Sequence, residues 1–249
     1  MSDVLIPDWP APANVRALVT TRAGGVSQMP YGSLNLGGHV GDTAEAVAEN
    51  RSRLRRLVPA EPVWLEQVHG VAVAEADVAS GLLQADASVA RRAGVVCAVM
   101  TADCLPVLFC DDEGTVVAAA HAGWRGLAAG VLEATVARMG VAPEQVLAWL
   151  GPAIGPAAFE VGGEVRAAFL DSDPSAADAF VSSDQPGKWL ADLYALARLR
   201  LARAGVSRVY GGGECTYSDS VRFYSYRREG ATGRFASLVW REPSAAAEP

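Results

Sequence analysis

The stretch VVCAVMTADCLPVLFCDDEGTVVAAAHAGWR, residues 95–125, decides the fold. It contains three apolar runs, at residues 95–100, 105–110 and 116–120. Runs of this length bounded by turn residues are typical of buried strands, and the acidic and glycine residues of 111–114 predict a hairpin turn. Cys104 lies in the polar break between the first two runs, and His121 follows the third. Because strand ends commonly present reactive groups, we expect both side chains at a functional site.

Composition and charge argue against several classes of protein. The chain of 249 residues has a net charge of -7 and no long Lys/Arg run, which argues against a nucleic-acid-binding surface. No stretch approaches the roughly 18 uninterrupted apolar residues of a membrane span. The N-terminus lacks a signal-peptide pattern, and the four cysteines form neither a C-x-x-C pair nor a secreted disulfide framework. We therefore expect a cytoplasmic protein without nucleic-acid or membrane partners.

Strand-like and helix-like segments mix along the chain, which predicts an α/β (α+β) fold with a mixed sheet. Besides the three central runs, strands are expected at residues 13–21, 63–68, 71–74, 85–89, 146–150, 206–210 and 235–240. Helices are expected at residues 43–57, 124–139, 161–170 and 190–204. The Gly-rich segment 21–42 is expected to be a functional loop because it is long and carries specific polar side chains. The polar segment 172–187 is expected to be loop-rich.

Three side chains are the candidates for chemistry: His69, which ends an earlier strand, Cys104 and His121. Imidazole and thiolate are preferred zinc ligands, and three protein ligands with a vacant fourth position are typical of a catalytic site. Zinc held there would lower the pKa of a bound water towards neutrality. Without a metal, the same set predicts a Cys104 nucleophile, a histidine base and Asp103 as the orienting group. Each residue also has a plainer interpretation as a buried side chain, and the irregular spacing alone is a weak metal pattern.

Several longer motifs accompany these residues. TADCLPVLF, AAHAGWRGL and QVHG contain the three candidates, and TTRAGGVS, SLNLGGHVGD, WLGPAIGP, FEVG, CTY and FYSYRREGATGR flank them. Together these motifs resemble the polyphenol oxidase or laccase-domain family, whose members are described as zinc-dependent purine nucleoside phosphorylases. The resemblance extends from about Val15 to Trp240, which is nearly the whole chain.

The resemblance implies a fold, a metal site and a set of activities. The fold would be a single catalytic domain, residues 1–242, built as a layered α/β sandwich with mixed β-sheets, and residues 243–249 would be a disordered C-terminal tail. One Zn²⁺, with copper as the alternative, would be held by His69, Cys104 and His121. The implied activities are phosphorolysis of adenosine, inosine, guanosine and methylthioadenosine, and hydrolytic deamination of adenosine. The partners would be purine nucleosides and phosphate, with the chain a monomer or a homodimer.

The remaining candidate residues follow from what these reactions need. Asp103, beside Cys104, is the candidate general acid–base group for deamination. Phosphorolysis needs a pocket that holds an anion against the sugar. The candidates for this pocket, with the first preferred, are Arg51, Arg125 and Arg227. The side chains expected to line the nucleoside pocket are Asn35, His39 and Gln67. Arg22 and Arg234 have a structural alternative, in which they pin Gly-rich loops through backbone carbonyls.

Two other hypotheses stay open. The chain could be a metal-free cysteine amidohydrolase that edits peptidoglycan precursors, with Cys104 as its nucleophile. It could also be a non-enzymatic binding module with structural zinc, although a structural site usually has four protein ligands. The older label of polyphenol oxidase (laccase) would require copper chemistry, and three histidines cannot fill a multi-copper site.

Overall fold

A computed structural model describes residues 4–243 of the chain. Its strands are β1 (Val4–Leu5), β2 (Val15–Thr20), β3 (Leu65–Glu66), β4 (Val73–Glu75), β5 (Leu83–Gln84), β6 (Ala87–Ala90), β7 (Val96–Thr101), β8 (Leu105–Asp111), β9 (Val117–Ala122), β10 (Val146–Leu150), β11 (Glu160–Gly162), β12 (Phe180–Ser182), β13 (Lys188–Ala191), β14 (Arg208–Gly211) and β15 (Phe235–Arg241). Its α-helices are α1 (Ala44–Arg55), α2 (Trp124–Ala129), α3 (Val131–Met139), α4 (Gly163–Leu170), α5 (Leu193–Arg203) and α6 (Tyr226–Glu229). Its 3-10 helices are η1 (Ala76–Val78), η2 (Pro143–Gln145) and η3 (Pro174–Ala179).

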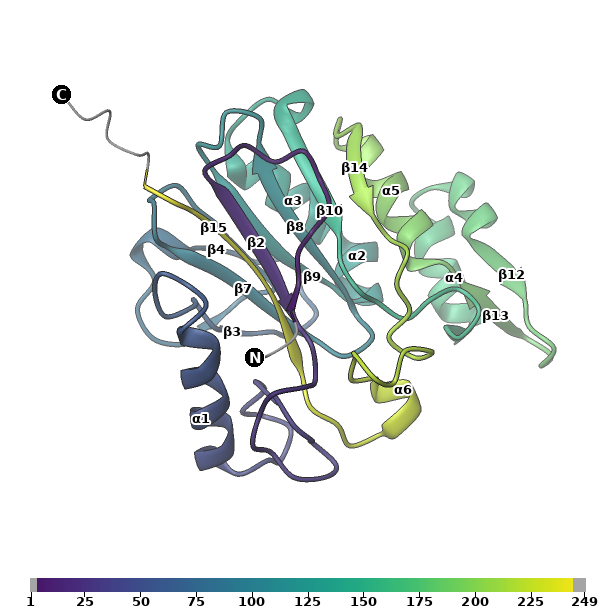
Figure 1. The fold of residues 1–249 in the computed structure, drawn as a ribbon. Coiled ribbons are helices and arrows are strands. Elements are labelled where there is room, and N and C mark those ends of the chain that lie inside the picture. Colours follow the sequence, from purple (N-terminus) through teal and green to yellow (C-terminus); the bar gives the residue numbers. More distant parts are fainter. Residues whose placement is uncertain (1–3, 244–249) are drawn as a thin grey trace.

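Two β-sheets face each other at the centre of the molecule (Figure 1). The antiparallel sheet has the order β1-β2-β15-β7, and the mixed sheet has the order β14-β10-β8-β9-β6-β4. β7 and β15 pack against β8 and β9, so the sheets form a sandwich. Helices α2, α3 and α5 cover the outer face of the mixed sheet, and α1 packs on the antiparallel sheet. A small sheet, β11-β13-β12, lies with α4 at the far side from α1.

The alternation of side chains along β8 explains why the central runs are apolar without a break. Leu105, Val107 and Phe109 pack in the core shared with the helices, whereas Leu108 and Cys110 lie between the two sheets. All seven residues of β8 are buried. Successive side chains of a strand point to opposite faces of the sheet. Because an apolar layer covers each face here, every position needs an apolar side chain, and the usual alternation of apolar and polar residues disappears.

The helix predicted over residues 124–139 is two helices, and the prediction of one is wrong. Gly130 adopts φ 102, which ends α2 and precedes α3. This left-handed conformation is the usual end of a helix, and glycine adopts it without a steric penalty. The apolar stripe of α3 is buried as predicted, and Gly140 ends it with φ 73.

Other element limits differ from the predictions for local reasons. The helix predicted over 190–204 begins only at Leu193, because the Asp192 side chain accepts hydrogen bonds from the backbone N–H groups of Tyr194 and Ala195 and caps it. The residues just before Asp192 form β13, which pairs with β11. Because β11 takes up residues 160–162, the helix predicted over 161–170 begins only at Gly163. The segment 172–187 contains η3 and β12 in addition to loops.

The predicted layered α/β fold with mixed sheets is confirmed. The domain limits 1–242 and the disordered tail 243–249 stay predictions, and 244–249 lie outside the described residues. Within residues 4–243, no helix has both the length and the apolar character needed to cross a membrane.

Candidate metal centre

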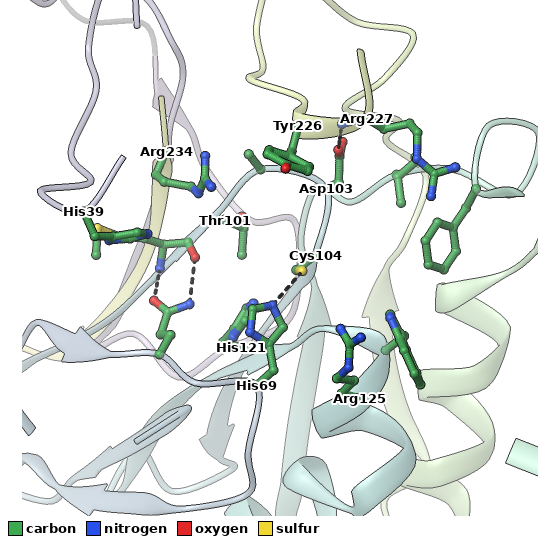
Figure 2. A pocket seen from close by; sticks show the side chains of 16 residues that line it. His39, His69, Thr101, Asp103, Cys104, His121, Arg125, Tyr226, Arg227 and Arg234 are labelled. Atoms are coloured by element: carbon green, nitrogen blue, oxygen red, sulfur yellow. Dashed lines mark hydrogen bonds between the residues drawn. The ribbon is translucent and has the colours of Figure 1, made fainter. Parts of the chain in front are cut away.

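Three segments that are far apart in the sequence meet beside one end of the central strands (Figure 2). His69 lies in the turn after β3, Cys104 in the turn between β7 and β8, and His121 near the end of β9. Their imidazole nitrogens and sulfur all lie within 4.8 Å of one another. Cys104 Sγ is 3.9 Å from His69 Nε2, and the two imidazole rings meet edge to face with their centroids 4.8 Å apart. The structure therefore brings the three predicted ligands together.

A glycine keeps open the space on which the three donors converge. In the β8–β9 ladder Pro106 pairs with His121, so the chain before Pro106 runs beside the chain after His121, and Cys104 comes next to Gly123. A Cβ built on Gly123 would lie 2.8 Å from His69 Cδ2, 3.1 Å from Cys104 Sγ and 3.5 Å from His121 Nε2. Any larger residue at position 123 would occupy the place where a shared ion must sit.

The donor set fits a zinc ion. In a tetrahedral site with usual bond lengths, a ligating sulfur and nitrogen lie about 3.6 Å apart. The observed 3.9 Å between Cys104 Sγ and His69 Nε2 is close to that value. Three protein donors leave one position for water or substrate, as in catalytic zinc sites. Imidazole and thiolate also accept copper, so the donors define a single-ion site without selecting between the two metals.

A buried carboxylate that the sequence analysis missed orients both histidines. Asp86 is fully buried, and its Oδ1 accepts hydrogen bonds from His121 Nδ1 at 2.8 Å and from the backbone N–H of His69 at 2.9 Å. Its Oδ2 accepts from the backbone N–H groups of Gly70 at 2.6 Å and Val68 at 3.2 Å. Because Nδ1 of His121 faces the carboxylate, Nε2 is the nitrogen that faces the other donors. One carboxylate thus fixes the ring of one ligand and the backbone of the other.

Two residues of the site have backbone conformations that non-glycine residues rarely adopt. His69 has φ 61 and Asp103 has φ 88. The hydrogen bonds to Asp86 hold the His69 turn, and the Asp103 carboxylate accepts from Thr216 Oγ1 and from the backbone N–H of Arg227, both at 2.7 Å. Such conformations persist where the surroundings over-determine them, often at functional sites. Both oxygens of Asp103 are engaged in this way, so the carboxylate that orients a histidine is Asp86.

The thiol and one imidazole change each other's protonation state. Burial raises the pKa of the Cys104 thiol, but the charge of His121 and hydrogen bonds with both imidazoles bring that pKa down to about 6. Burial lowers the pKa of His121, but the Cys104 thiolate and Asp86 raise it to about 9. At neutral pH the metal-free pair is thiolate and imidazolium. By contrast, burial raises the pKa of Cys97 and Cys110 to about 12, as expected for inert core thiols.

A cavity of about 540 Å³ adjoins the three donors, and its volume is within the range of small-molecule sites. Its walls combine aromatic and basic side chains. The aromatic ones are Trp124, Phe159 and Tyr226, and the basic ones, besides the two ligand histidines, are His39, Arg125, Arg227 and Arg234. In Figure 2, His39 and Arg234 lie on one side of the donors and Arg125 and Arg227 on the other. Such walls suit a flat aromatic ligand accompanied by an anion.

Four of the six residues predicted to bind substrate or phosphate line this cavity, namely His39, Gln67, Arg125 and Arg227. Arg51 does not. Its Nε and Nη2 donate to the carbonyl oxygen of Leu36 at 3.1 and 2.9 Å, and its guanidinium lies 4.2 Å from the centroid of the Trp64 ring. Arg51 therefore holds the Gly-rich loop against α1, and the structure places it outside the cavity lining.

Asn35 also lies away from the cavity wall, and Gln67 uses its amide on the backbone. The Asn35 Oδ1 accepts from the backbone N–H groups of Gly37 and Arg234, both at 2.9 Å. The Gln67 side chain donates to and accepts from the Met100 backbone, both at 2.8 Å. Asn35 therefore acts on the site through Arg234, and Gln67 ties the segment before His69 to β7.

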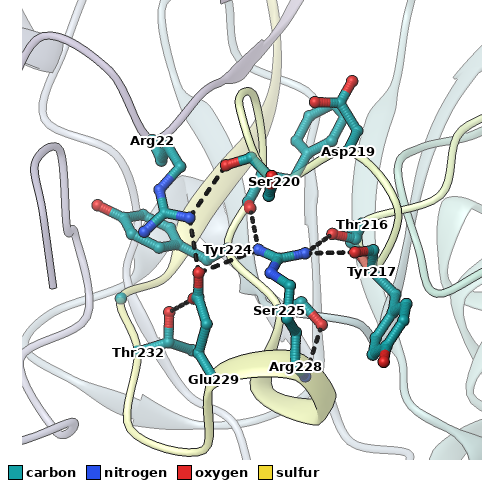
Figure 3. Close-up of polar contacts among 12 residues, drawn as sticks. Arg22, Thr216, Tyr217, Asp219, Ser220, Tyr224, Ser225, Arg228, Glu229 and Thr232 are labelled. Carbon is teal, nitrogen blue, oxygen red and sulfur yellow. Dashed lines mark hydrogen bonds and ion pairs between the residues drawn. The ribbon is translucent and has the colours of Figure 1, made fainter. Parts of the chain in front are cut away.

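Figure 3 shows the polar network that holds α6 beside the cavity. Arg228 donates to the carbonyl oxygens of residues 216 and 217, both at 2.6 Å, and to Glu229 at 3.1 Å. Glu229 also accepts from Arg22 at 2.7 Å. The network joins the loop after β2 to the C-terminal part of the chain. It fixes α6, whose first two side chains line the cavity. Arg22 therefore has the structural role given as its alternative, as it also donates to the Gly32 carbonyl oxygen at 3.2 Å.

Comparisons with known proteins agree over nearly the whole chain. A purine nucleoside phosphorylase of Pseudomonas aeruginosa is 64% identical over 240 residues, covering 96% of this chain and 99% of that protein. Purine nucleoside phosphorylase YfiH of Escherichia coli K12 is 56% identical over 243 residues, with the same coverages of 96% and 99%. The crystal structure of a Neisseria meningitidis protein of the family DUF152 matches with a TM-score of 0.94 and 57% identity over 96% of this chain and 99% of that one.

A more distant solved structure, YlmD from Geobacillus stearothermophilus, matches with a TM-score of 0.84 and 34% identity over 94% of each chain. The family model described as multi-copper polyphenol oxidoreductase laccase matches residues 16–242. The motifs around the three converging donors, the fold and these relatives all agree, and the chain belongs to the multi-copper polyphenol oxidoreductase laccase family.

Proposed function

We propose that the chain is a zinc-dependent purine nucleoside phosphorylase. The observation that carries the proposal is the convergence of His69, Cys104 and His121 beside a cavity of about 540 Å³ with aromatic and basic walls. The names of the Pseudomonas aeruginosa and Escherichia coli relatives support the same activity. The proposed substrates are adenosine, inosine, guanosine and methylthioadenosine, each with inorganic phosphate.

The reaction defines what the cavity must do. A phosphate oxygen forms a bond to ribose C1′ while the bond from C1′ to the purine N9 breaks, and the base leaves with the electron pair and takes up a proton. The chain has to hold a flat base and a phosphate dianion together. Aromatic faces stack on bases, and Trp124, Phe159 and Tyr226 supply them. Fixed positive charge on the wall stabilises the anion in its attacking position without reorganisation.

Zinc bound by the three donors would supply a Lewis acid next to the reacting groups. The chain's own contribution is preorganisation. Asp86 fixes the His121 ring and the His69 turn, and Gly123 keeps the ion position open. Hydrolytic deamination of adenosine is proposed as a secondary activity, with Asp103 as its acid–base group, because this residue lines the cavity next to Cys104.

A second candidate function has specific structural support. Cys104, His121 and Asp86 lie in the order nucleophile, base and orienting acid, with the ligand atoms of Cys104 and His121 within 4.8 Å of each other and a 2.8 Å contact from His121 to Asp86. This arrangement suits an amidohydrolase that edits peptidoglycan precursors and needs no metal. Multi-copper oxidation has less support, because within residues 4–243 one cluster of ligand side chains is found and the chain has three histidines.

A phosphate-dependence assay tests the proposal. Zinc-loaded protein should release hypoxanthine from inosine only when phosphate is present, and zinc chelation or Cys104→Ala should abolish the release. Cys215→Ser, which changes a half-buried cysteine outside the cavity lining, is the matched control and should keep wild-type turnover. Base release without phosphate, or full turnover by Cys104→Ala, would contradict the proposal. Zinc-independent hydrolysis of a serine-containing muropeptide would favour the amidohydrolase.

A further inference from the structure

Arg234 is a half-buried cation on the cavity wall, and within residues 4–243 it forms no ion pair. Its Nη1 donates to the carbonyl oxygens of Thr232 and Gly233, both at 3.0 Å. Among the described residues its Nε and Nη2 have no hydrogen-bond partner, and a buried guanidinium without an anion carries a free-energy penalty. Arg234 therefore has donors on the cavity wall for which the described residues supply no hydrogen-bond partner.

Three other arginines with largely buried side chains are each paired with a carboxylate. The side chains of Arg22, Arg200 and Arg228 are 14%, 12% and 20% exposed, and each has a carboxylate oxygen within 3.1 Å. These three hold structural elements together. Arg234 differs from these three because its guanidinium donates to carbonyl oxygens of its own loop and lines the cavity, with no carboxylate paired to it in residues 4–243. Arg51 and Arg166 also lack a paired carboxylate, but each lies over a tryptophan ring outside the cavity lining. The difference points to an anionic ligand.

The Gly-rich loop clamps Arg234 in place. The Arg234 backbone N–H donates to Asn35 Oδ1 at 2.9 Å, and the Arg234 carbonyl oxygen accepts from the Leu36 backbone N–H at 3.0 Å. A Cβ built on Gly37 would lie 2.9 Å from Arg234 Cγ, so the arginine stem packs directly on the glycine backbone. The guanidinium is thus preorganised, which lowers the entropy lost when it binds a ligand.

Two further polar groups lie on the same side of the cavity (Figure 2). His39 lines the wall, and burial together with the charges of Arg234 and Arg51 lowers its pKa, so its imidazole is neutral at pH 7. The Thr101 hydroxyl is buried and has no hydrogen-bond partner in the described part of the chain. Thr101 pairs in the sheet with Phe235, the residue after Arg234. A guanidinium fork, an imidazole and a hydroxyl together match the acceptors of a phosphate.

The two arginines on the opposite side of the cavity have other partners (Figure 2). Arg227 Nη1 donates to the Glu160 carbonyl oxygen at 2.8 Å, and the Arg125 guanidinium lies 4.5 Å from the Trp124 ring centroid. We infer that inorganic phosphate binds to Arg234, with His39 and Thr101 beside it, and that Arg51 plays no direct part. The inference rests on the proposed phosphorolysis and names the residue that holds its cosubstrate.

Two measurements on the zinc-loaded protein test the subsite. The first is the KM for phosphate at saturating inosine, and the second is direct calorimetric titration with inorganic phosphate alone. Loss of a charge-assisted contact predicts that Arg234→Gln raises the phosphate KM and Kd about tenfold or more, with the KM for inosine nearly unchanged. Arg51→Gln and the control Arg53→Gln, which changes a half-buried arginine outside the cavity lining, should leave both phosphate constants near wild type. Arg234→Lys, which keeps the charge and loses the fork, should lie between.

A second variant keeps the test independent of folding effects at position 234. Gly37→Ala retains the guanidinium but pushes its stem, and phosphate affinity should fall severalfold. Wild-type phosphate affinity in both Arg234→Gln and Gly37→Ala, a larger loss in Arg51→Gln, or no phosphate binding by the wild type would overturn the inference. If the wild type binds phosphate at Arg234 but catalyses no phosphorolysis, the proposed function fails and the subsite stands.

Discussion

Replacing Asp86 with asparagine changes a fully buried carboxylate into an amide of nearly the same shape. The carboxylate accepts hydrogen bonds from His121 Nδ1 and from the backbone N–H groups of Val68, His69 and Gly70, at 2.8, 3.2, 2.9 and 2.6 Å. The amide offers one accepting oxygen, and its NH₂ group would face donors. At least two of these donors therefore lose their acceptor.

The magnitude follows from these contacts. Each buried donor left without an acceptor costs roughly 1–3 kcal/mol, so with two such donors the free energy of unfolding of the metal-free protein should fall by about 2–6 kcal/mol. The loss of the contact to Nδ1 also frees the His121 ring to rotate and to change tautomer. Changes of this kind lower metal affinity about 10- to 100-fold. The zinc Kd of Asp86→Asn should rise by that factor.

A competition titration against a chromophoric chelator measures the zinc Kd, and urea unfolding measures stability. The matched control is Asp111→Asn, since Asp111 is also buried and accepts from the Thr115 backbone N–H, the Thr115 hydroxyl and the Val116 backbone N–H. It lies in the β8–β9 hairpin turn, so it should lose stability and keep its zinc affinity. Wild-type zinc affinity in Asp86→Asn, or an equal loss in Asp111→Asn, would refute the positioning role.

Three further predictions concern the site and its support. Gly123→Ala places a Cβ 2.8 Å from a ligand imidazole, so zinc should bind about tenfold or more weakly in the same titration, and unchanged affinity would argue against the open ion position. Iodoacetamide should alkylate Cys104 in metal-free protein and not in zinc-loaded protein; peptide mass spectrometry measures this, and equal labelling would place the sulfur outside the metal site. Burial raises the pKa of Glu229, but hydrogen bonds from Thr232 and two arginines bring it below its usual 4.5. Its contribution to stability is therefore full above about pH 4.5 and is lost as pH falls through the folded-state pKa. Urea unfolding across this range should show Glu229→Gln less stable above pH 4.5 and less sensitive to acid below it, and parallel curves would contradict the network.

The sheets and the three donors could be predicted because their signals are local. The three central apolar runs correspond to β7, β8 and β9, and Cys104 and His121 stand out because they interrupt or end those runs. Asp86 also carried a local signal, an acid inside a short apolar segment, since a buried charge needs a partner. Its partners lie in other strands, however, and the sequence alone does not name them.

The cavity wall could not be predicted in the same way. Nothing local separates an arginine that faces a ligand from one that faces a carbonyl oxygen, and Arg51 on α1 faces Leu36 whereas Arg234 before β15 faces the cavity. The difference depends on how a helix and a loop dock on the sheet. The break at Gly130 was missed for a related reason, because the apolar stripe continues across it and glycine is compatible with a helix interior.

X-ray absorption spectroscopy of the zinc-loaded protein tests the central claim most directly, because it counts the donor atoms around the ion. We expect one sulfur at about 2.3 Å, two imidazole nitrogens at about 2.0–2.1 Å and one light atom from water or substrate. The sulfur signal should disappear in Cys104→Ala. A shell of four protein ligands, or a shell without sulfur in the wild type, would contradict a catalytic ion held by His69, Cys104 and His121.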